Sequence, residues 1–81
     1  MISIIYLKNV AIITKEEYED HFEFQDRYED YVANLGWSTT EELIQFIKND
    51  FGLTPENEER LRRHISKLRN GKYLNLDDYI D

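Results

Sequence analysis

Residues 2–14 read ISIIYLKNVAIIT, and this stretch decides the class of the fold. Two β-branched runs, Ile2 to Leu7 and Val10 to Thr14, stand on either side of Lys8-Asn9. β-Branched residues favour strands and Asn favours turns, so the pattern predicts a β-hairpin with Asn9 in its turn. Neither run alternates cleanly between apolar and polar residues, so we expect at least one strand to be buried on both faces. A single strand followed by a loop is the alternative.

The next segment, from about residue 15 to residue 35, is predicted to form a helix. It opens with Thr14-Lys15-Glu16-Glu17, which matches a capping box in which Glu17 reaches back to Thr14. Five apolar residues then recur at helical spacing on one face: Phe24, Tyr28, Tyr31, Val32 and Leu35. Gly36 follows as a natural C-cap. The run from His21 to Phe24 alternates as a strand would, so a break near Phe22 stays open.

Two further helices are expected in the second half of the chain. Ser38 or Thr39 caps the first of them, which has a matching Glu three residues on and ends at Gly52. Thr54-Pro55 starts the second, because Thr is a good N-cap and Pro suits the first helical position. The second helix has three apolar residues as its buried stripe: Leu61, Ile65 and Leu68.

The last helix is expected to end at Asn70-Gly71, which leaves a tail over residues 72–81. The tail forms either a third strand through Tyr73, Leu74 and Leu76 or a short helical turn. The sequence thus predicts one α+β domain over residues 1–81. It consists of a small antiparallel sheet, made of the N-terminal hairpin and, if the tail is extended, a C-terminal third strand, with about three α-helices.

The composition argues against several classes of function. The chain has no Cys, which excludes disulfides and thiolate metal sites and favours the reducing cytoplasm. Its apolar start lacks a basic region and is interrupted by Lys8, so we expect neither a signal peptide nor a membrane span. His21 and His64 lack metal-ligand spacing and are expected to be half-buried packing residues. We expect no catalytic residue, no metal and no cofactor, because nucleophile contexts and phosphate loops are also missing.

The net charge of −7 is concentrated in one segment. Between residues 15 and 34 there are eight acidic residues against two basic ones. On a helix, six of the eight cluster opposite the apolar face: Glu16, Glu19, Asp20, Glu23, Asp26 and Asp30. Carboxylates three or four residues apart on a helix stand about 5–6 Å apart, which is similar to the repeat of phosphates along a nucleic-acid strand. This stripe predicts a mimic of DNA phosphates that binds a basic groove, and a solvated helix face is the alternative.

Residues 59–72 carry the opposite charge, with six basic residues against Glu59 alone. Arg60, Arg63 and Lys67 share one exposed face of the predicted helix. Together with the preceding helix and a short turn, the layout resembles a helix-turn-helix whose second helix contacts DNA. Two other interpretations stay open. The charges also follow the helix dipole, with acids in the first turn and bases in the last, and the basic face could pair with the acidic helix within a monomer or across a dimer.

Three short runs of residues resemble a known family. Phe51-Gly-Leu-Thr-Pro55 and Lys67-Leu-Arg-Asn-Gly-Lys-Tyr-Leu-Asn75 resemble the C-terminal half of small acidic phage anti-CRISPR proteins that inhibit type I-F surveillance complexes. The run His21-Phe-Glu-Phe24 is similar to a Phe-Glu-Phe strand of that family. The resemblance implies an α+β phage inhibitor whose carboxylates occupy a nucleic-acid-binding groove.

The leading hypothesis is therefore a non-enzymatic phage or mobile-element inhibitor in the cytoplasm of the host cell. Its acidic stripe would block a basic groove on a nucleic-acid-handling protein, such as a CRISPR-Cas complex. The alternative is a helix-turn-helix regulator that uses the basic helix over residues 55–70. A dimer with complementary acidic and basic faces is a third hypothesis. Because a chain of net charge −7 repels polyanions, we expect no direct binding of nucleic acid and no membrane partner.

Overall fold

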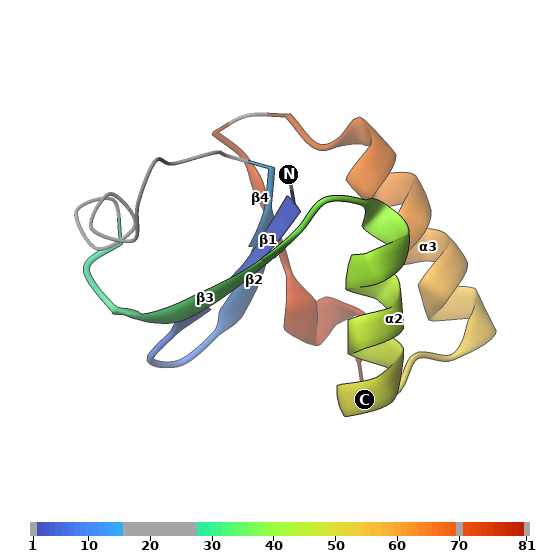
Figure 1. Ribbon diagram of the computed structural model, residues 1–81, viewed down its shortest axis with the longest axis horizontal. Coiled ribbons are helices and arrows are strands. Elements are labelled where there is room, and N and C mark those ends of the chain that lie inside the picture. Colours follow the sequence, from blue (N-terminus) through green and yellow to red (C-terminus); the bar gives the residue numbers. More distant parts are fainter. Residues whose placement is uncertain (1, 16–27, 70, 81) are drawn as a thin grey trace.

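The computed structural model describes residues 2–15, 28–69 and 71–80, whose arrangement is shown in Figure 1. Four strands form one sheet in the order β3-β1-β2-β4, and each neighbouring pair is antiparallel. The strands are β1 (Ile2–Leu7), β2 (Ala11–Thr14), β3 (Tyr31–Trp37) and β4 (Tyr73–Asn75). The helices within the described residues are α2 (Thr40–Asp50), α3 (Pro55–Lys67) and the short 3₁₀-helix η1 (Leu76–Asp78). None of these helices is long and apolar enough to cross a membrane.

β1 and β2 form the hairpin predicted from residues 2–14. Tyr6 pairs with Ala11 at the turn, where the Leu7 N–H donates to the Val10 carbonyl at 2.8 Å. Both strands are buried on their two faces, as expected from the lack of alternation. Four residues from the two strands are at most 2% exposed: Ile4, Ile5, Ile12 and Ile13.

β3 contradicts the prediction of a helix over residues 15–35. Tyr31–Trp37 is a strand that pairs with β1, so the helical prediction is wrong from Tyr31 onward. Gly36, predicted to cap a helix, pairs with Ser3 inside the sheet. The physical reason is tertiary: β3 satisfies the backbone groups on the side of β1 that β2 leaves unpaired. Across the described residues, the fold has four strands and two α-helices, in place of the predicted two or three strands and about three helices.

The beginning of that predicted helix is described only in part. Thr14, predicted as its N-cap, is the last residue of β2, and its hydroxyl donates to the Lys72 carbonyl at 3.4 Å. Glu17 and the possible break near Phe22 lie outside the described residues. Thr14 therefore contributes to the sheet and to the anchoring of the C-terminal tail.

α2 begins and ends where the sequence indicates. Of the two candidate N-caps, Ser38 and Thr39, the structure has Thr39. Its Oγ1 accepts a hydrogen bond from the Glu42 N–H at 3.2 Å. The Thr39 hydroxyl also donates to the Glu42 carboxylate at 3.2 Å. At the other end, Gly52 has φ 83° and donates its N–H to the Ile47 carbonyl at 3.0 Å. This left-handed conformation is inexpensive for glycine alone, which explains why the helix stops there.

α3 begins as predicted but ends earlier. Thr54 is the N-cap and accepts a hydrogen bond from the Asn57 N–H at 3.2 Å. Pro55 lies in the first turn, where its missing N–H leaves no intrahelical bond unmade. The helix ends at Lys67, before the predicted end at Asn70-Gly71. The residues that follow Lys67 are thereby released from the helix to lead the chain back toward the sheet.

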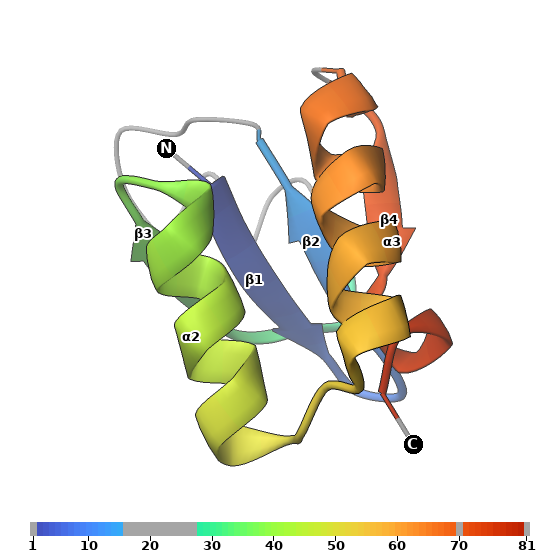
Figure 2. The ribbon, with the colours of Figure 1, turned by 90° about the vertical axis from the view of Figure 1, so that its right-hand side faces the viewer.

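The two helices lie side by side on one face of the sheet (Figure 2). Ten buried residues form the core on this face: Ile2, Ile4, Ile13, Leu43, Ile44, Ile47, Leu61, Ile65, Leu76 and Tyr79. Ile5 and Ile12 form a smaller cluster on the other face, against which Tyr28 and Tyr31 pack. Each fully buried aliphatic side chain stabilises the fold by about 1.5–3 kcal/mol, so the larger cluster holds the helices to the sheet.

The C-terminal tail contains both of the elements that the sequence left open. β4 pairs with β2, with Leu74 opposite Ile13. Leu76, predicted to lie on the strand, instead begins the turn of η1 and is buried together with Tyr79. The tail thus closes the sheet on the β2 side and covers the end of the core.

Candidate functional site

Of the six residues predicted to form the acidic stripe, Asp30 is the one that the structure describes. The other five lie outside the described residues: Glu16, Glu19, Asp20, Glu23 and Asp26. Asp30 is exposed in the turn before β3, and its carbonyl accepts a hydrogen bond from the Lys8 N–H at 3.1 Å. This bond holds the turn against the hairpin. Because β3 begins at Tyr31, Asp30 is not inside the continuous helix that the stripe assumed.

β3 is an outer strand of the sheet and carries exposed apolar side chains. Val32 is 61% exposed and Leu35 is 43% exposed. Glu29 and Asp30, both exposed, come directly before the strand. We call Glu29, Asp30, Val32 and Leu35 the acidic edge. An outer strand offers backbone groups to another chain, so this edge combines charge, apolar surface and backbone in the way that protein-binding strands do.

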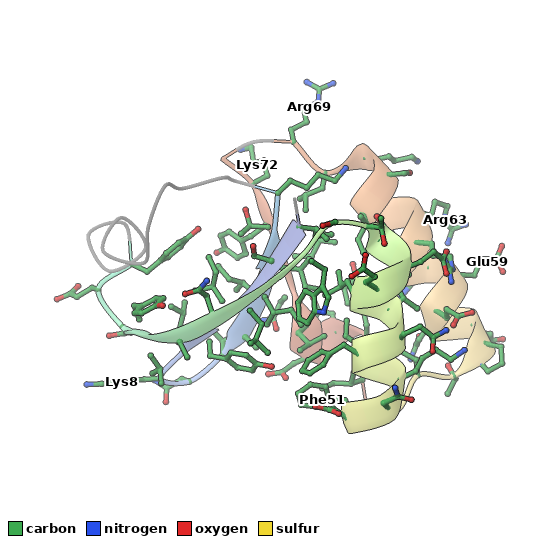
Figure 3. All side chains as sticks on the ribbon, viewed as in Figure 1. Lys8, Phe51, Glu59, Arg63, Arg69 and Lys72 are labelled. Atoms are coloured by element: carbon green, nitrogen blue, oxygen red, sulfur yellow. The ribbon has the colours of Figure 1, made fainter. Side chains whose placement is uncertain are left out.

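The three basic residues predicted to face DNA are not displayed together. Arg60 is half-buried: its guanidinium carbon lies 4.8 Å from the centre of the Tyr79 ring, and its Nη2 donates to the Asp78 carbonyl. Arg63 and Lys67 are exposed, and Figure 3 shows Arg63 on the outer side of α3. Two of the three cations are therefore available to a ligand, whereas Arg60 fastens the C-terminal tail to α3.

Two ion pairs join α2 to α3, and one of them uses a cation of residues 59–72, Arg62. Arg62 donates to both carboxylate oxygens of Glu41, with 3.0 Å between Nη2 and Oε2. This hydrogen bonding lowers the pKa of Glu41 and raises the pKa of Arg62. The Lys48 Nζ lies 2.9 Å from Oε1 of Glu58. Exposed pairs of this kind contribute little to stability, but Glu41 neutralises one cation of residues 59–72, Arg62.

A groove with a volume of about 330 Å³ lies between the C-terminal end of α3 and β4. On the helix side it is lined by His64, Lys67 and Leu68. On the strand side it is lined by Arg69, Lys72, Tyr73 and Leu74. We call it the basic groove, because Lys67, Arg69 and Lys72 are cations and none of its lining residues is acidic. The charge count of residues 59–72 indicated these cations, but the groove itself depends on the return of β4 beside α3.

His64 links the basic groove to the core. Its Nδ1 lies 2.6 Å from the Tyr79 hydroxyl, and the two rings meet edge to face with centroids 5.7 Å apart. Burial raises the pKa of Tyr79, against the opposing effect of Arg60 and with a further increase from Asp78. The phenol hydroxyl and Nδ1 share one hydrogen bond, whose direction depends on the tautomer of the imidazole. The prediction of a half-buried packing role is confirmed for His64, while His21 lies outside the described residues.

Comparisons of this chain with models of protein families, with curated proteins and with solved structures give no match. The two surfaces defined above, the acidic edge and the basic groove, are thus the starting points for assigning a function. The resemblance to type I-F anti-CRISPR proteins rests on the quoted residues from Phe51 to Asn75 and from His21 to Phe24.

Proposed function

We propose that the protein is a non-enzymatic inhibitor whose acidic segment, residues 16–30, binds a basic groove on a nucleic-acid-handling protein. The distribution of charge supports this proposal. Residues 16–30 contain eight acidic residues and Arg27, so their net charge equals the −7 of the whole chain. The remaining residues are balanced, with nine acids and nine bases. Because the negative charge is concentrated in one segment, it orients the protein when it approaches a basic surface. An evenly spread charge would only repel other anions.

The acidic edge is the observation that carries the proposal. Charged pairs at the rim of an interface steer association, but the affinity of a complex comes mainly from buried apolar contacts. Val32 offers such contacts two residues after Asp30, and Leu35 follows three residues further along the same outer strand. A partner with a basic groove and an apolar rim fits this combination. Occupation of that groove would exclude the phosphates of the nucleic acid that it normally binds.

The resemblance supports a more specific version of the proposal. If the chain acts as the type I-F inhibitors do, its partner is a CRISPR-Cas surveillance complex and its origin is a phage or another mobile element. The site of action is then the cytoplasm of the host cell, where such complexes work. The absence of Cys from the chain agrees with a reducing compartment.

The helix-turn-helix alternative receives less support. A recognition helix must present its basic residues to the major groove together. In this chain Arg60 is held by Tyr79 and Asp78, and Arg62 is paired with Glu41. α3 also lies flat against the sheet beside α2 (Figure 2), with Leu61 and Ile65 buried beneath it.

Binding to a purified type I-F surveillance complex tests the proposal with two matched double variants. Glu29→Lys/Asp30→Lys reverses the charge at the acidic edge, while Glu59→Lys/Asp77→Lys makes the same change in net charge at exposed positions elsewhere. We expect the first variant to lose most of its affinity and the second to retain it. Affinity of the wild-type chain should fall with added salt, because exposed charge pairs are screened.

A larger variant includes the acidic residues outside the described part. Reversal of Glu19, Glu23, Asp26 and Asp30 to Lys should abolish binding, while circular dichroism shows that the fold survives. A folded quadruple variant that binds as tightly as the wild type would refute the proposal. If the surveillance complex does not bind at all, the specific target is wrong, and binding by other basic nucleic-acid-handling proteins decides whether the general proposal holds.

A further inference from the structure

β3 is an outer strand of the sheet, and part of it lacks the features that keep such strands from pairing further. The register of β3 against β1 is regular over residues 33–37, and the extra residue of the bulge, Val32, comes before them. Outer strands are commonly protected by charged side chains, proline or a bulge, and residues 33–37, ANLGW, contain none of these. Among the described residues, β3 pairs with β1 alone. Residues 33–37 therefore offer a backbone edge to a further strand.

Leu35 and Trp37 lie on the face of this strand that carries the helices. They pair with Ile4 and Ile2, which belong to the core on that face, and paired residues share a face of the sheet. Trp37 is half-buried and packs against this core, whereas Leu35 is 43% exposed. Leu35 is thus an open apolar side chain at the edge, next to one that the helices cover in part.

Three aromatic rings extend this apolar surface from β3 onto α2. The ring centroids of Trp37 and Phe46 lie 4.9 Å apart, and those of Phe46 and Phe51 lie 6.2 Å apart. Phe46 is half-buried, and Phe51 is 41% exposed at the end of α2, where Figure 3 shows it. We call Leu35, Trp37, Phe46 and Phe51 the apolar strip. Adjoining exposed apolar side chains mark contact sites, whereas isolated ones do not, so the strip adds an apolar surface to the backbone edge.

Carboxylates lie at both ends of β3. Glu29 and Asp30 come directly before the strand, and Glu42 lies in the first turn of α2, which follows it. Residues 29–52 hold five acidic residues against one basic residue, Lys48, and Lys48 is paired with an acid of α3. The edge therefore favours an added strand whose middle is apolar and whose ends are basic.

The same charges disfavour a second copy of this chain as the added strand. An antiparallel pairing of two β3 strands would bring Glu29 and Asp30 of one copy to the acidic start of α2 in the other. Like charges placed across an interface weaken it. The occupant that fits the edge is thus a segment of a different, basic protein.

We propose that residues 33–37 bind an extended segment of the basic partner protein as a fifth strand of the sheet. The inference rests on the proposed function for the identity of the partner, and it adds the way in which that partner is held. Backbone hydrogen bonds to β3 hold the segment, and the apolar strip selects apolar side chains on one of its faces. Basic residues at the ends of the segment meet the carboxylates before and after β3.

A synthetic peptide tests strand addition without the partner protein: Lys-Lys-Val-Thr-Val-Thr-Val-Lys-Lys, acetylated and amidated. Nuclear magnetic resonance of the full chain with this peptide should show shifts of the backbone amides of residues 33–37 and slower hydrogen exchange at alternate residues among them. N-methylation of every second amide blocks one of the two edges of the peptide. Of the two possible methylation patterns, one should abolish binding and the other should retain it, because an added strand pairs through a single edge.

Two charge-matched variants test the contribution of the apolar strip. Leu35→Lys should weaken binding of the peptide about fivefold or more, because it removes an apolar contact and repels the basic peptide. Tyr73→Lys makes the same kind of change on β4, the other outer strand, where Tyr73 is 59% exposed. This control variant should bind the peptide as the wild type does.

Any of four results would overturn the proposal. They are no change at residues 33–37 with millimolar peptide, equal losses with both methylation patterns, equal effects of Leu35→Lys and Tyr73→Lys, and protection of residues 33–37 that rises with protein concentration when no peptide is present. The last result would assign the edge to a second copy of the chain. Because the probe is a peptide, failure here leaves the proposed function to its own test with the surveillance complex, and failure there changes the partner but not the mode of binding.

Discussion

Arg60 stacks on Tyr79, with its guanidinium carbon 4.8 Å from the centre of the ring. The same side chain donates to the carbonyl of Asp78, and the hydroxyl of Tyr79 lies 2.6 Å from Nδ1 of His64. Tyr79 is 4% exposed, so both of its partners on α3 hold a residue of the core. A basic residue on a charged helix thereby serves the packing of the C-terminal tail.

Replacement of Arg60 by Ala should therefore destabilise the protein. Loss of the cation–π contact and of one hydrogen bond is expected to lower the free energy of unfolding by about 1–2 kcal/mol. Arg63→Ala is the matched control, because it removes the same side chain from an exposed position of the same helix, and its effect should stay within about 0.5 kcal/mol. Urea denaturation measures both values. Equal effects of the two substitutions would contradict a structural role of Arg60.

The sequence correctly predicted the strands and helices that are specified by neighbouring residues in the chain. The hairpin of residues 2–14 follows from its β-branched runs, and α2 and α3 follow from caps that involve neighbouring residues. β3 is different, because a bulge shifts its register against β1 between Tyr6 and Leu7. The half-buried residues of the strand are Tyr31, Asn34 and Trp37, whereas Val32 and Leu35, which the helical spacing places on one apolar face, are exposed. The spacing of apolar residues alone could therefore not identify the strand.

The candidate sites could be predicted only in part for a similar reason. The acidic segment and the basic segment are visible as charge counts along the chain. The acidic edge exists because Val32 and Leu35 lie on an outer strand, and that position depends on the pairing of β3 with β1. The basic groove exists because β4 returns beside α3, so that residues of both elements line it. Both depend on contacts between residues far apart in sequence.

The N-cap of α2 offers a second prediction, since the sequence left Ser38 and Thr39 as alternatives. Thr39→Ala removes the acceptor of the Glu42 N–H and should lower the free energy of unfolding by about 1 kcal/mol. Ser38→Ala, at the exposed neighbouring position, should have little effect. The two urea denaturation midpoints decide between the caps. A larger loss in Ser38→Ala than in Thr39→Ala would show that the helix is capped by the other residue.

Stability should also depend on pH in the alkaline range, through two tyrosines. Burial raises the pKa of Tyr79, against the opposing effect of Arg60. Burial also raises the pKa of Tyr6, and the carboxylate of Asp50 raises it further. A tyrosine in the unfolded chain ionises near pH about 10. Because the folded pKa values are higher, the stabilisation is complete below that pH and is lost as the pH rises through the folded values.

The thermal unfolding midpoint of the wild type should accordingly fall as the pH increases above about 10. Tyr79→Phe and Tyr6→Phe should each show a smaller fall, and the double variant the smallest. Tyr79→Phe also loses its hydrogen bond to His64, which costs about 1 kcal/mol at every pH. The fall between neutral and alkaline pH, measured for each protein by circular dichroism, is therefore the quantity to compare. If the double variant loses as much stability as the wild type, groups other than Tyr6 and Tyr79 cause the alkaline unfolding.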